Sequence, residues 1–264
     1  MECDGCRLCE GETVVFIDRK QREYVAQLRT GQDTNIRGGR IAHTGIIGGL
    51  VGVRATSSTG ERFMVLRPTL AQFIMNMPRT GQIIYPKDIA IILLWADVFP
   101  GARVVEGGIG SGAMAMALVR AVTSSGRVFS YETREDVMRR AEKNITQFLG
   151  VSSALELRLG DIYAGIQETE IDRVILDVPE PWDVVTHASA ALKPGGLLVS
   201  YVPTIIQVRH LVDTLQHTSS FCCEQAIEVL VRPWNVEGMS VRPVHRMVAH
   251  TGFIVSARCQ GLST

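Results

Sequence analysis

The sequence predicts an α/β protein in which a small β-rich unit precedes a larger parallel sheet covered by helices. Residues 13–66 contain short β-rich segments separated by turn residues. From residue 103 onward, strand patterns alternate with longer helical patterns, an order typical of βαβ units. The first of these strands also runs into a glycine-rich turn, at the sheet edge where open α/β sheets bind ligands.

The first unit is predicted from four β-rich segments, which cover residues 13–17, 22–28, 49–55 and 62–66. Glycines at 31, 38, 39 and 45 and the run 57–60 provide the turns between them. Four or five short strands are about what a compact β-barrel needs. A boundary at residues 67–68 gives predicted domains of 1–68 and 69–264.

Longer helices follow this boundary. Helical spacing covers 69–77 and 87–97, and the second helix begins just after Pro86, which suits a first turn. Strands at 103–106, 126–132, 155–159, 172–177 and 196–201 then alternate with helices at 113–122, 134–149, 182–192 and 204–217. Two final strands, 224–232 and 247–257, have no helix between them and predict an antiparallel edge.

Composition is that of a folded domain, with 264 residues of which 46% are hydrophobic and 20% charged. Basic and acidic residues number 27 each, so the formal net charge is zero and gives no global attraction to a polyanion. The longest apolar run, 89–95, is far shorter than the roughly 18 to 20 residues that a bilayer span needs. The N-terminus has no apolar signal core. We therefore expect a cytoplasmic protein without membrane contact.

Three of the six cysteines, Cys3, Cys6 and Cys9, have the spacing of metal ligands. Three thiolates fall short of the four ligands of a closed zinc site, and the segment lies at a terminus. We therefore expect a flexible extension there and no metal site.

A glycine-rich turn, residues 104–113 with the sequence VVEGGIGSGA, joins the first strand of the sheet to its helix. Glycines allow a tight turn and let the backbone approach a ligand closely. Residues 108–113 match the dinucleotide fingerprint G-x-G-x-x-A, and residues 106–112 match the E-x-G-x-G-x-G loop of class I S-adenosylmethionine-dependent methyltransferases. A tight turn without a ligand is the third possibility.

Residues outside the turn favour the methyltransferase. Glu132 closes the second strand, where a carboxylate can accept hydrogen bonds from both ribose hydroxyls in either cofactor class. Asp161 follows the third strand, where methyltransferases commonly place an acid for the adenine amino group. The segment 192–196, LKPGG, is also a typical methyltransferase turn. We therefore predict S-adenosylmethionine as the cofactor.

With these segments, the chain resembles the bacterial and archaeal tRNA adenine-N1 methyltransferases that modify the adenosine at tRNA position 58. The likeness covers about residues 11–258. Its discriminating parts are YPKD at 85–88 and DVPEPW at 177–182, combined with the glycine turn. RFMVLRP at 62–68, SYE at 130–132 and HTGF at 250–253 add to it.

The resemblance implies a Rossmann-like class I methyltransferase sheet with a small N-terminal β-barrel-like domain for RNA binding or oligomerisation. It also implies a homotetramer that transfers a methyl group from S-adenosylmethionine to N1 of adenosine 58 in the T-loop of tRNA. The implied cofactor-binding residues are Glu106, Gly108, Ile109, Gly110, Ser111, Gly112, Glu132, Asp161 and Asp177, the last of them against the methionine end.

The chain departs from the family pattern at two places. Gly107 stands where the family usually has alanine, and only a methyl group is lost. A histidine-rich tract of the N-terminal unit is replaced by residues 34–37, TNIR, with His43 nearby. The RNA contacts of that unit are therefore in question.

Methylation of adenine N1 needs correct placement and stabilisation of positive charge, because the in-plane lone pair of N1 is already nucleophilic. Asp177 is the main catalytic candidate, since its carboxylate can accept a hydrogen bond from the N6 amino group and oppose the developing charge; it can also simply cap the following helix. Tyr85 is the second catalytic candidate, because its ring can border an adenine that has been flipped out of its stack. The alternative is that the ring only packs at the start of a helix. His250 is assigned to the substrate pocket, with packing as the alternative.

Two other functions stay open. The chain can be a methyltransferase-like subunit that holds RNA without catalysis, although every predicted cofactor residue is present. It can also methylate another acceptor, such as a protein carboxylate or a small molecule, which leaves the β-rich unit and the segment 85–88 without a purpose. In the tRNA interpretation, one neutral protomer binds tRNA weakly and an oligomer brings basic surfaces together.

Overall fold

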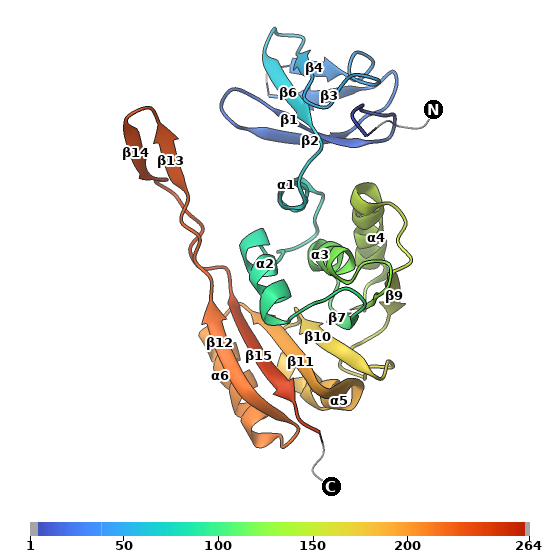
Figure 1. Ribbon diagram of the computed structural model, residues 1–264, viewed down its shortest axis with the longest axis vertical. Coiled ribbons are helices and arrows are strands. Elements are labelled where there is room, and N and C mark those ends of the chain that lie inside the picture. The colour runs from blue at the N-terminus through green and yellow to red at the C-terminus, as the bar shows by residue number, and fades with distance from the viewer. Residues whose placement is uncertain (1–4, 38, 262–264) are drawn as a thin grey trace. The chain divides into compact units, whose positions relative to one another are not determined.

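The computed structural model describes residues 5–37 and 39–261, which form two compact units, the first ending at Pro78 and the second beginning at Arg79 (Figure 1). Helix α1 (Leu70–Asn76) belongs to the first unit, because it packs on β2 (Glu23–Gln27). There the amide of Gln72 donates to a Glu23 carboxylate oxygen over 2.7 Å. The boundary predicted at residues 67–68 therefore lies before this helix, and the compact units divide after it.

The first unit is built on a four-stranded antiparallel sheet of order β2-β1-β6-β5, with β1 at Thr13–Ile17, β5 at Arg54–Thr56 and β6 at Arg62–Leu66. A separate ladder pairs β3 (Asp33–Ile36) with β4 (Gly39–Ala42). The strand predicted at 49–55 is mostly wrong, since only its last two residues belong to β5 and its first residues form turns. The sheet and the ladder enclose one core, with Leu8, Phe16, Leu28, Ile41 and Phe63 fully buried.

His43, which stands near the replaced histidine-rich tract, is a core residue of this unit with only 2% of its surface exposed. The backbone N–H of Arg29 donates to Nδ1 over 3.0 Å, and Nε2 forms a hydrogen bond with the Thr34 hydroxyl over 2.6 Å. The ring ties three chain segments together, and it is too buried to contact RNA.

The second unit contains a seven-stranded sheet of order β12-β15-β11-β10-β7-β8-β9. All its strands run parallel except β15, which is antiparallel to both of its neighbours. The strands are β7 (Arg103–Gly107), β8 (Arg127–Glu132), β9 (Leu155–Leu159), β10 (Ile171–Leu176), β11 (Leu192–Val202), β12 (Phe221–Glu228) and β15 (Phe253–Cys259). This arrangement confirms the predicted Rossmann-like α/β sheet and its terminal antiparallel pair.

Helices cover both faces of this sheet, as the sequence predicts (Figure 1). One face carries α2 (Pro86–Trp95), α3 (Ala113–Val122) and α4 (Glu135–Leu149), of which α3 is buried almost all round. The other face carries η1 (Pro181–Val184), α5 (Val185–Ala191) and α6 (Ile205–His217), packed on apolar side chains of β10, β11 and β15. This burial of apolar surface on both faces is the main source of stability for a parallel sheet.

The bounds of the last two strands differ from the prediction, because the stretch between them forms an arm. β12 ends at Glu228 and β15 begins at Phe253, and residues 229–252, which we call the arm, project from the sheet as a two-stranded extension (Figure 1). Its tip is a hairpin of β13 (Trp234–Glu237) and β14 (Ser240–Pro243) that the sequence did not predict. The apolar residues 229–231, before Pro233, were included in the predicted strand 224–232, but they extend away from the sheet rather than into it.

No helix in the described part of the chain is long and apolar enough to cross a membrane. Within residues 5–37 and 39–261, no group of three His, Cys, Asp or Glu side chains is placed to hold a metal ion. Cys3, one of the three cysteines with metal-like spacing, lies outside those ranges.

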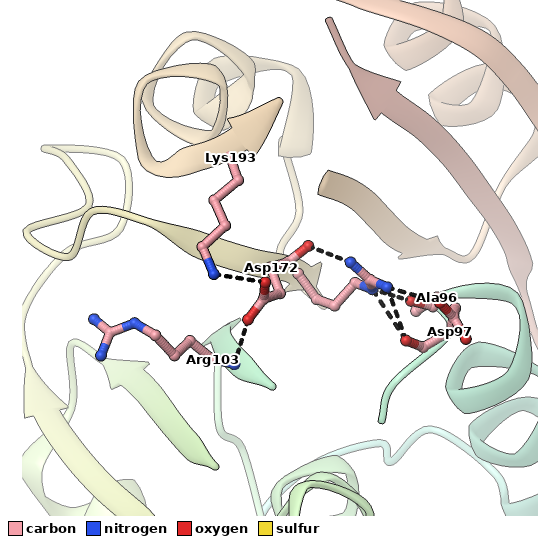
Figure 2. A network of polar contacts seen from close by, with 6 residues as sticks. Ala96, Asp97, Arg103, Asp172 and Lys193 are labelled. Atoms are coloured by element: carbon pink, nitrogen blue, oxygen red, sulfur yellow. Dashed lines mark hydrogen bonds and ion pairs between the residues drawn. The ribbon is translucent and has the colours of Figure 1, made fainter. Parts of the chain in front are cut away.

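A buried arginine, Arg173, fastens the end of α2 to the sheet. Figure 2 labels its partners Ala96 and Asp97, and also Asp172 with Arg103 and Lys193. Arg173 of β10 is 7% exposed and donates through Nη2 to the backbone and side-chain oxygens of Asp97, each over 2.9 Å, and through Nε to the carbonyl of Ala96. These carbonyls belong to the helix C-terminus, which lacks intrahelical donors and favours a cation. Next to Arg173 in the chain, the Asp172 carboxylate accepts hydrogen bonds from the backbone N–H of Arg103 and from the Lys193 ammonium, each over 2.8 Å.

We predict that Arg173→Met lowers the free energy of unfolding by about 3 kcal/mol, because each buried acceptor left without a donor costs about 1–3 kcal/mol. Urea denaturation of the purified chain measures this as a lower midpoint. The matched control is Lys193→Met, because the Lys193 side chain is more than one third exposed and the loss of its ion pair should cost less than about 1 kcal/mol. Equal midpoints for the two variants would contradict the assignment.

Candidate active site

The glycine-rich turn lies at the carboxyl edge of the sheet, between β7 and α3. Gly112 is the N-cap of α3 with φ +87°, and a Cβ there would lie 3.0 Å from Ile145, so the position requires glycine. The N–H of Ile109 donates to the carbonyl of Tyr131 over 3.0 Å, which fastens the turn to β8. Ile109 and Ser111 are buried and Gly110 is partly exposed.

Four of the predicted cofactor residues border one cavity of about 200 Å³ beside this turn. They are Gly108, Glu132, Asp161 and Asp177, and the other lining residues are Tyr131, Thr133, Gly160, Ile162, Tyr163, Val178 and Pro179. A Cβ on Gly108 would lie only 3.7 Å from a carboxylate oxygen of Glu132, so the absent side chain keeps the space beside that acid open. Acceptors for a ribose and for an adenine amino group thus share one cavity, and these residues fit an adenosine-containing cofactor.

A hydrogen bond within its own loop fixes the Asp161 side chain and leaves one of its carboxylate oxygens available to a ligand. One carboxylate oxygen accepts the N–H of Tyr163 over 2.9 Å, an Asx-type turn that fixes the side chain. No described residue donates to its second oxygen. Glu132 similarly accepts the N–H of Arg134 over 3.1 Å through one of its two oxygens.

Glu106, predicted to bind the cofactor, does not line this cavity. Its side chain is buried and accepts a hydrogen bond from the Ser130 hydroxyl, while its other oxygen has no partner in the described structure. Burial, with the nearby charge of Asp177 adding to it, raises the pKa of Glu106 to about 8. At pH 7 the Glu106 side chain is therefore mostly neutral.

A second cavity of about 350 Å³ brings together the three residues predicted to act on the substrate. Tyr85, Asp177 and His250 line it, with Gln82, Ile83, Tyr201, Pro203, Val248 and Thr251. They come from the start of α2, the end of β10 and the arm, which are far apart in the sequence. Asp177 borders both cavities, so one carboxylate lies between the predicted cofactor and substrate sites.

The Asp177 carboxylate has no hydrogen-bond donor among the described residues. Its surface is exposed to the two cavities, and desolvation by the protein that surrounds them raises the pKa of Asp177 to about 6. The following η1 helix has Glu180 as its N-cap, without a side-chain hydrogen bond. The geometry therefore does not support helix capping as the role of Asp177.

His250 is held in the wall of the second cavity by two acceptors. Nδ1 lies 2.7 Å from a carboxylate oxygen of Glu228, and Nε2 lies 2.8 Å from the carbonyl oxygen of Pro203. Both contacts favour a ring that carries both protons, and the hydrogen bond to Glu228 raises the pKa of His250. Because both ring nitrogens are engaged by protein acceptors, His250 is not placed to act as a base toward a substrate.

Sequence reasoning missed Tyr201 and Thr251, two further residues of the second cavity. Tyr201 lies near the carboxyl end of β11, and burial raises its pKa to about 12, so the phenol is protonated at neutral pH. Its ring rests on Gly252, where a Cβ would lie 2.5 Å from Cζ. The position of Tyr201 at a strand end and the glycine in the segment 250–253 were signals that could have found this contact.

Hydrogen bonds and the stacking of two rings hold the segment that follows Asp177. The hydroxyl of Tyr163 donates to a Glu180 carboxylate oxygen over 3.1 Å, and the Glu180 N–H donates to that hydroxyl over 3.0 Å. Trp182 stacks on His210 with ring centroids 4.1 Å apart. These contacts hold the wall that continues from Asp177.

Comparison with known proteins matches residues 62–250 to the tRNA methyltransferase complex GCD14 subunit family, and residues 7–53 to the TrmI-like N-terminal family. The chain is 36% identical to the tRNA (adenine(58)-N(1))-methyltransferase TrmI of Thermus thermophilus, over 91% of this chain and 94% of the relative. It is 32% identical to the tRNA (adenine(57)-N(1)/adenine(58)-N(1))-methyltransferase TrmI of Methanocaldococcus jannaschii, over 78% of this chain and 82% of the relative.

Among solved structures, a SAM-dependent O-methyltransferase from Thermotoga maritima superimposes with a TM-score of 0.92 and 35% identity, over 97% of this chain and 96% of that one. The fold, the cavity with its acidic residues and these relatives agree on a methyltransferase that uses S-adenosylmethionine. The chain belongs to the GCD14 family of tRNA methyltransferases.

Proposed function

We propose that this enzyme transfers the methyl group of S-adenosylmethionine to N1 of adenosine 58 in the T-loop of tRNA. The names of the relatives from Thermus and Methanocaldococcus support the substrate and the position. The observation that carries the proposal is the place of the Asp177 carboxylate, which borders both the cofactor cavity and a second cavity large enough for a base. A tRNA substrate also favours a cytoplasmic location.

In this proposal Gly108, Glu132 and Asp161 hold the cofactor, whose sulfonium supplies an electrophilic methyl group when bound. Glu132 accepts the ribose hydroxyls and Asp161 the adenine amino group. Ile109, Gly110, Ser111 and Gly112 shape the turn that keeps this space open, and the role of Glu106 is to support the turn from behind. The end of the cavity at Asp177 receives the methionine part.

Adenine N1 lies on the Watson–Crick edge, so the target nucleotide leaves its stack and enters the second cavity. Tyr85 and Tyr201 present aromatic surface there, which suits contact with a base. Asp177 accepts a hydrogen bond from the N6 amino group, which fixes the base with N1 toward the cofactor. As N1 gains the methyl group, the ring becomes positive, and the carboxylate stabilises that charge.

His250 serves in this scheme as a fixed wall of the pocket, because both of its ring nitrogens are engaged. The proton on N6 stays in place during the transfer, and no step needs a general base. At pH 7 the Asp177 carboxylate is mostly ionised, whereas Glu106 is mostly neutral.

For tRNA binding, we propose that the first unit contacts the phosphate backbone. Arg19, Arg54 and Arg62 border a hollow of about 430 Å³ on this unit, and none of the three forms an ion pair among the described residues. Unpaired guanidinium groups are suited to phosphate.

We further propose that the chain forms a homotetramer in which the β13–β14 hairpin binds a second copy. Cross-strand partners share a face, so Trp234, Val236, Val241 and Pro243 form one apolar face, and Asn235, Glu237, Ser240 and Arg242 form the other. Trp234, Val236 and Val241 are 57%, 70% and 60% exposed in the single chain. An isolated two-stranded hairpin is marginally stable in water, so this face needs a cover.

The test of the substrate uses purified enzyme, labelled S-adenosylmethionine and unmodified tRNA transcripts. We predict label in N1-methyladenosine at position 58, and no label when adenosine 58 is replaced by guanosine. Label at adenosine 57 would show that the enzyme also methylates this neighbouring position, which the name of the Methanocaldococcus relative includes. Label on an oxygen of a protein or small molecule, with none on tRNA, would favour the O-methyltransferase activity named for the Thermotoga structure.

A second prediction concerns pH. Because the pKa of Asp177 is raised to about 6, the carboxylate is half protonated at that pH and mostly ionised at 7. We expect kcat/KM for the cofactor, which reports the free enzyme, to be level above pH 7 and to fall about tenfold per pH unit below 6. Asp177→Asn should remove this acid limb. A rate that stays level down to pH 5 would contradict a role for the ionised form.

A third prediction concerns assembly. Trp234→Ser combined with Val236→Ser should shift the chain to smaller species in light scattering, while the circular dichroism of the fold is retained. The matched control is Asn235→Ser with Arg242→Ser on the polar face of the same hairpin. Loss of the oligomer in the control alone would place the interface on the other face.

A further inference from the structure

Two charged residues lie next to the second cavity without lining it. Lys87 and Asp88 stand in the first turn of α2, directly after Tyr85 and Pro86. The Asp88 side chain is fully buried, the Lys87 side chain is 11% exposed, and their charged groups are 2.9 Å apart. A buried ion pair offsets its loss of hydration only when both groups have further hydrogen bonds.

Those further bonds come from the two ends of the arm. The Lys87 ammonium donates to the carbonyl of Val229 and to the hydroxyl of Thr251, each over 2.6 Å. The same hydroxyl donates to the second oxygen of Asp88 over 2.7 Å. All three ammonium protons of Lys87 are therefore used, and both carboxylate oxygens of Asp88 are satisfied.

This group of contacts, which we call the Lys87 junction, joins three parts of the chain at one point. Val229 follows the last residue of β12, and Thr251 lies just before β15. The two ends of the arm also contact each other directly, through the hydrogen bond of His250 with Glu228, which lies beside the junction. The junction thus holds both ends of the arm against the helix that begins beside Tyr85.

We propose that Lys87 and Asp88 are positioning residues that set the width of the second cavity, by holding the wall formed by His250 and Thr251 opposite Tyr85. The proposal rests on the proposed function, because that cavity is the one assigned to the adenine. In this proposal the junction also connects the substrate site to the arm, whose tip is assigned to contact with a second copy of the chain.

Lys87→Met tests this directly, because it removes the ammonium and keeps most of the apolar stem. We expect kcat/KM for tRNA to fall by 10- to 100-fold, since displacement of a reacting group by about 1 Å costs on the order of 10²-fold. The dissociation constant of S-adenosylmethionine, measured by calorimetry, should stay unchanged, because neither residue touches the cofactor cavity. Wild-type kcat/KM in this variant would overturn the proposal.

The double variant Lys87→Met with Asp88→Asn separates positioning from general stability. Removing the unpaired buried carboxylate should restore much of the Tm that Lys87→Met loses. The contact with Val229 stays lost, so kcat/KM should remain low. Recovery of Tm and kcat/KM together would show that the junction is only structural and would overturn the proposal.

Hydrogen exchange gives a readout that does not depend on activity. Lys87→Met should speed the exchange of backbone amides in residues 228–252 and leave the strands β7 and β8 unchanged, whereas the control Lys193→Met should leave the arm unchanged. If the wild-type enzyme does not methylate tRNA, the proposed substrate fails, and this exchange still decides the junction. Unchanged exchange in the arm of Lys87→Met would overturn it.

Discussion

The Asp177 carboxylate receives no hydrogen bond from the described residues, and the surrounding protein desolvates it, so its ionised form is costly and the chemistry of the second unit depends on it. Desolvation raises its pKa to about 6, so the carboxylate is mostly ionised at neutral pH without a partner among the described residues. A charge in that state favours any cation or hydrogen-bond donor that enters beside it. Asp177 borders two cavities. A sulfonium in one cavity, or an adenine that becomes positive in the other, would place a positive charge beside this carboxylate.

The rest of the fold keeps this arrangement in place. Parallel strands bring the ends of β7, β8 and β10 to one edge, and the positive φ of Gly112 lets the chain turn there into α3. Arg173 fixes the far end of α2, and the Lys87 junction fixes its beginning. The position of Tyr85 relative to Asp177 is therefore set from both ends of one helix.

The sequence predicted the sheet and the acidic residues of the cavity assigned to the cofactor, because those features follow from local patterns. Strands and helices alternate with clear periodicity, and Glu132 and Asp161 occupy strand ends that any α/β sheet brings together. Glu106 matched the same motif, but its side chain faces the interior behind the turn, which a motif does not reveal.

The arm and the Lys87 junction could not be predicted in this way. The apolar residues around Pro233 have the composition of a sheet strand, and only tertiary structure shows that they leave the sheet. Lys87 meets Val229 and Thr251 across more than a hundred residues of sequence, and one sequence carries no signal for such a contact. The segment 85–88 was noticed for its family likeness, and its physical role became visible only from these contacts.

The most direct measurement is the single-turnover rate of methyl transfer to adenosine 58 by Asp177→Asn at saturating cofactor. The substitution keeps the shape of the side chain and removes its charge. The account predicts a rate lower by on the order of 10²-fold, as for the loss of one group that stabilises transition-state charge, while the variant still binds S-adenosylmethionine. A wild-type rate would contradict the central role of this carboxylate.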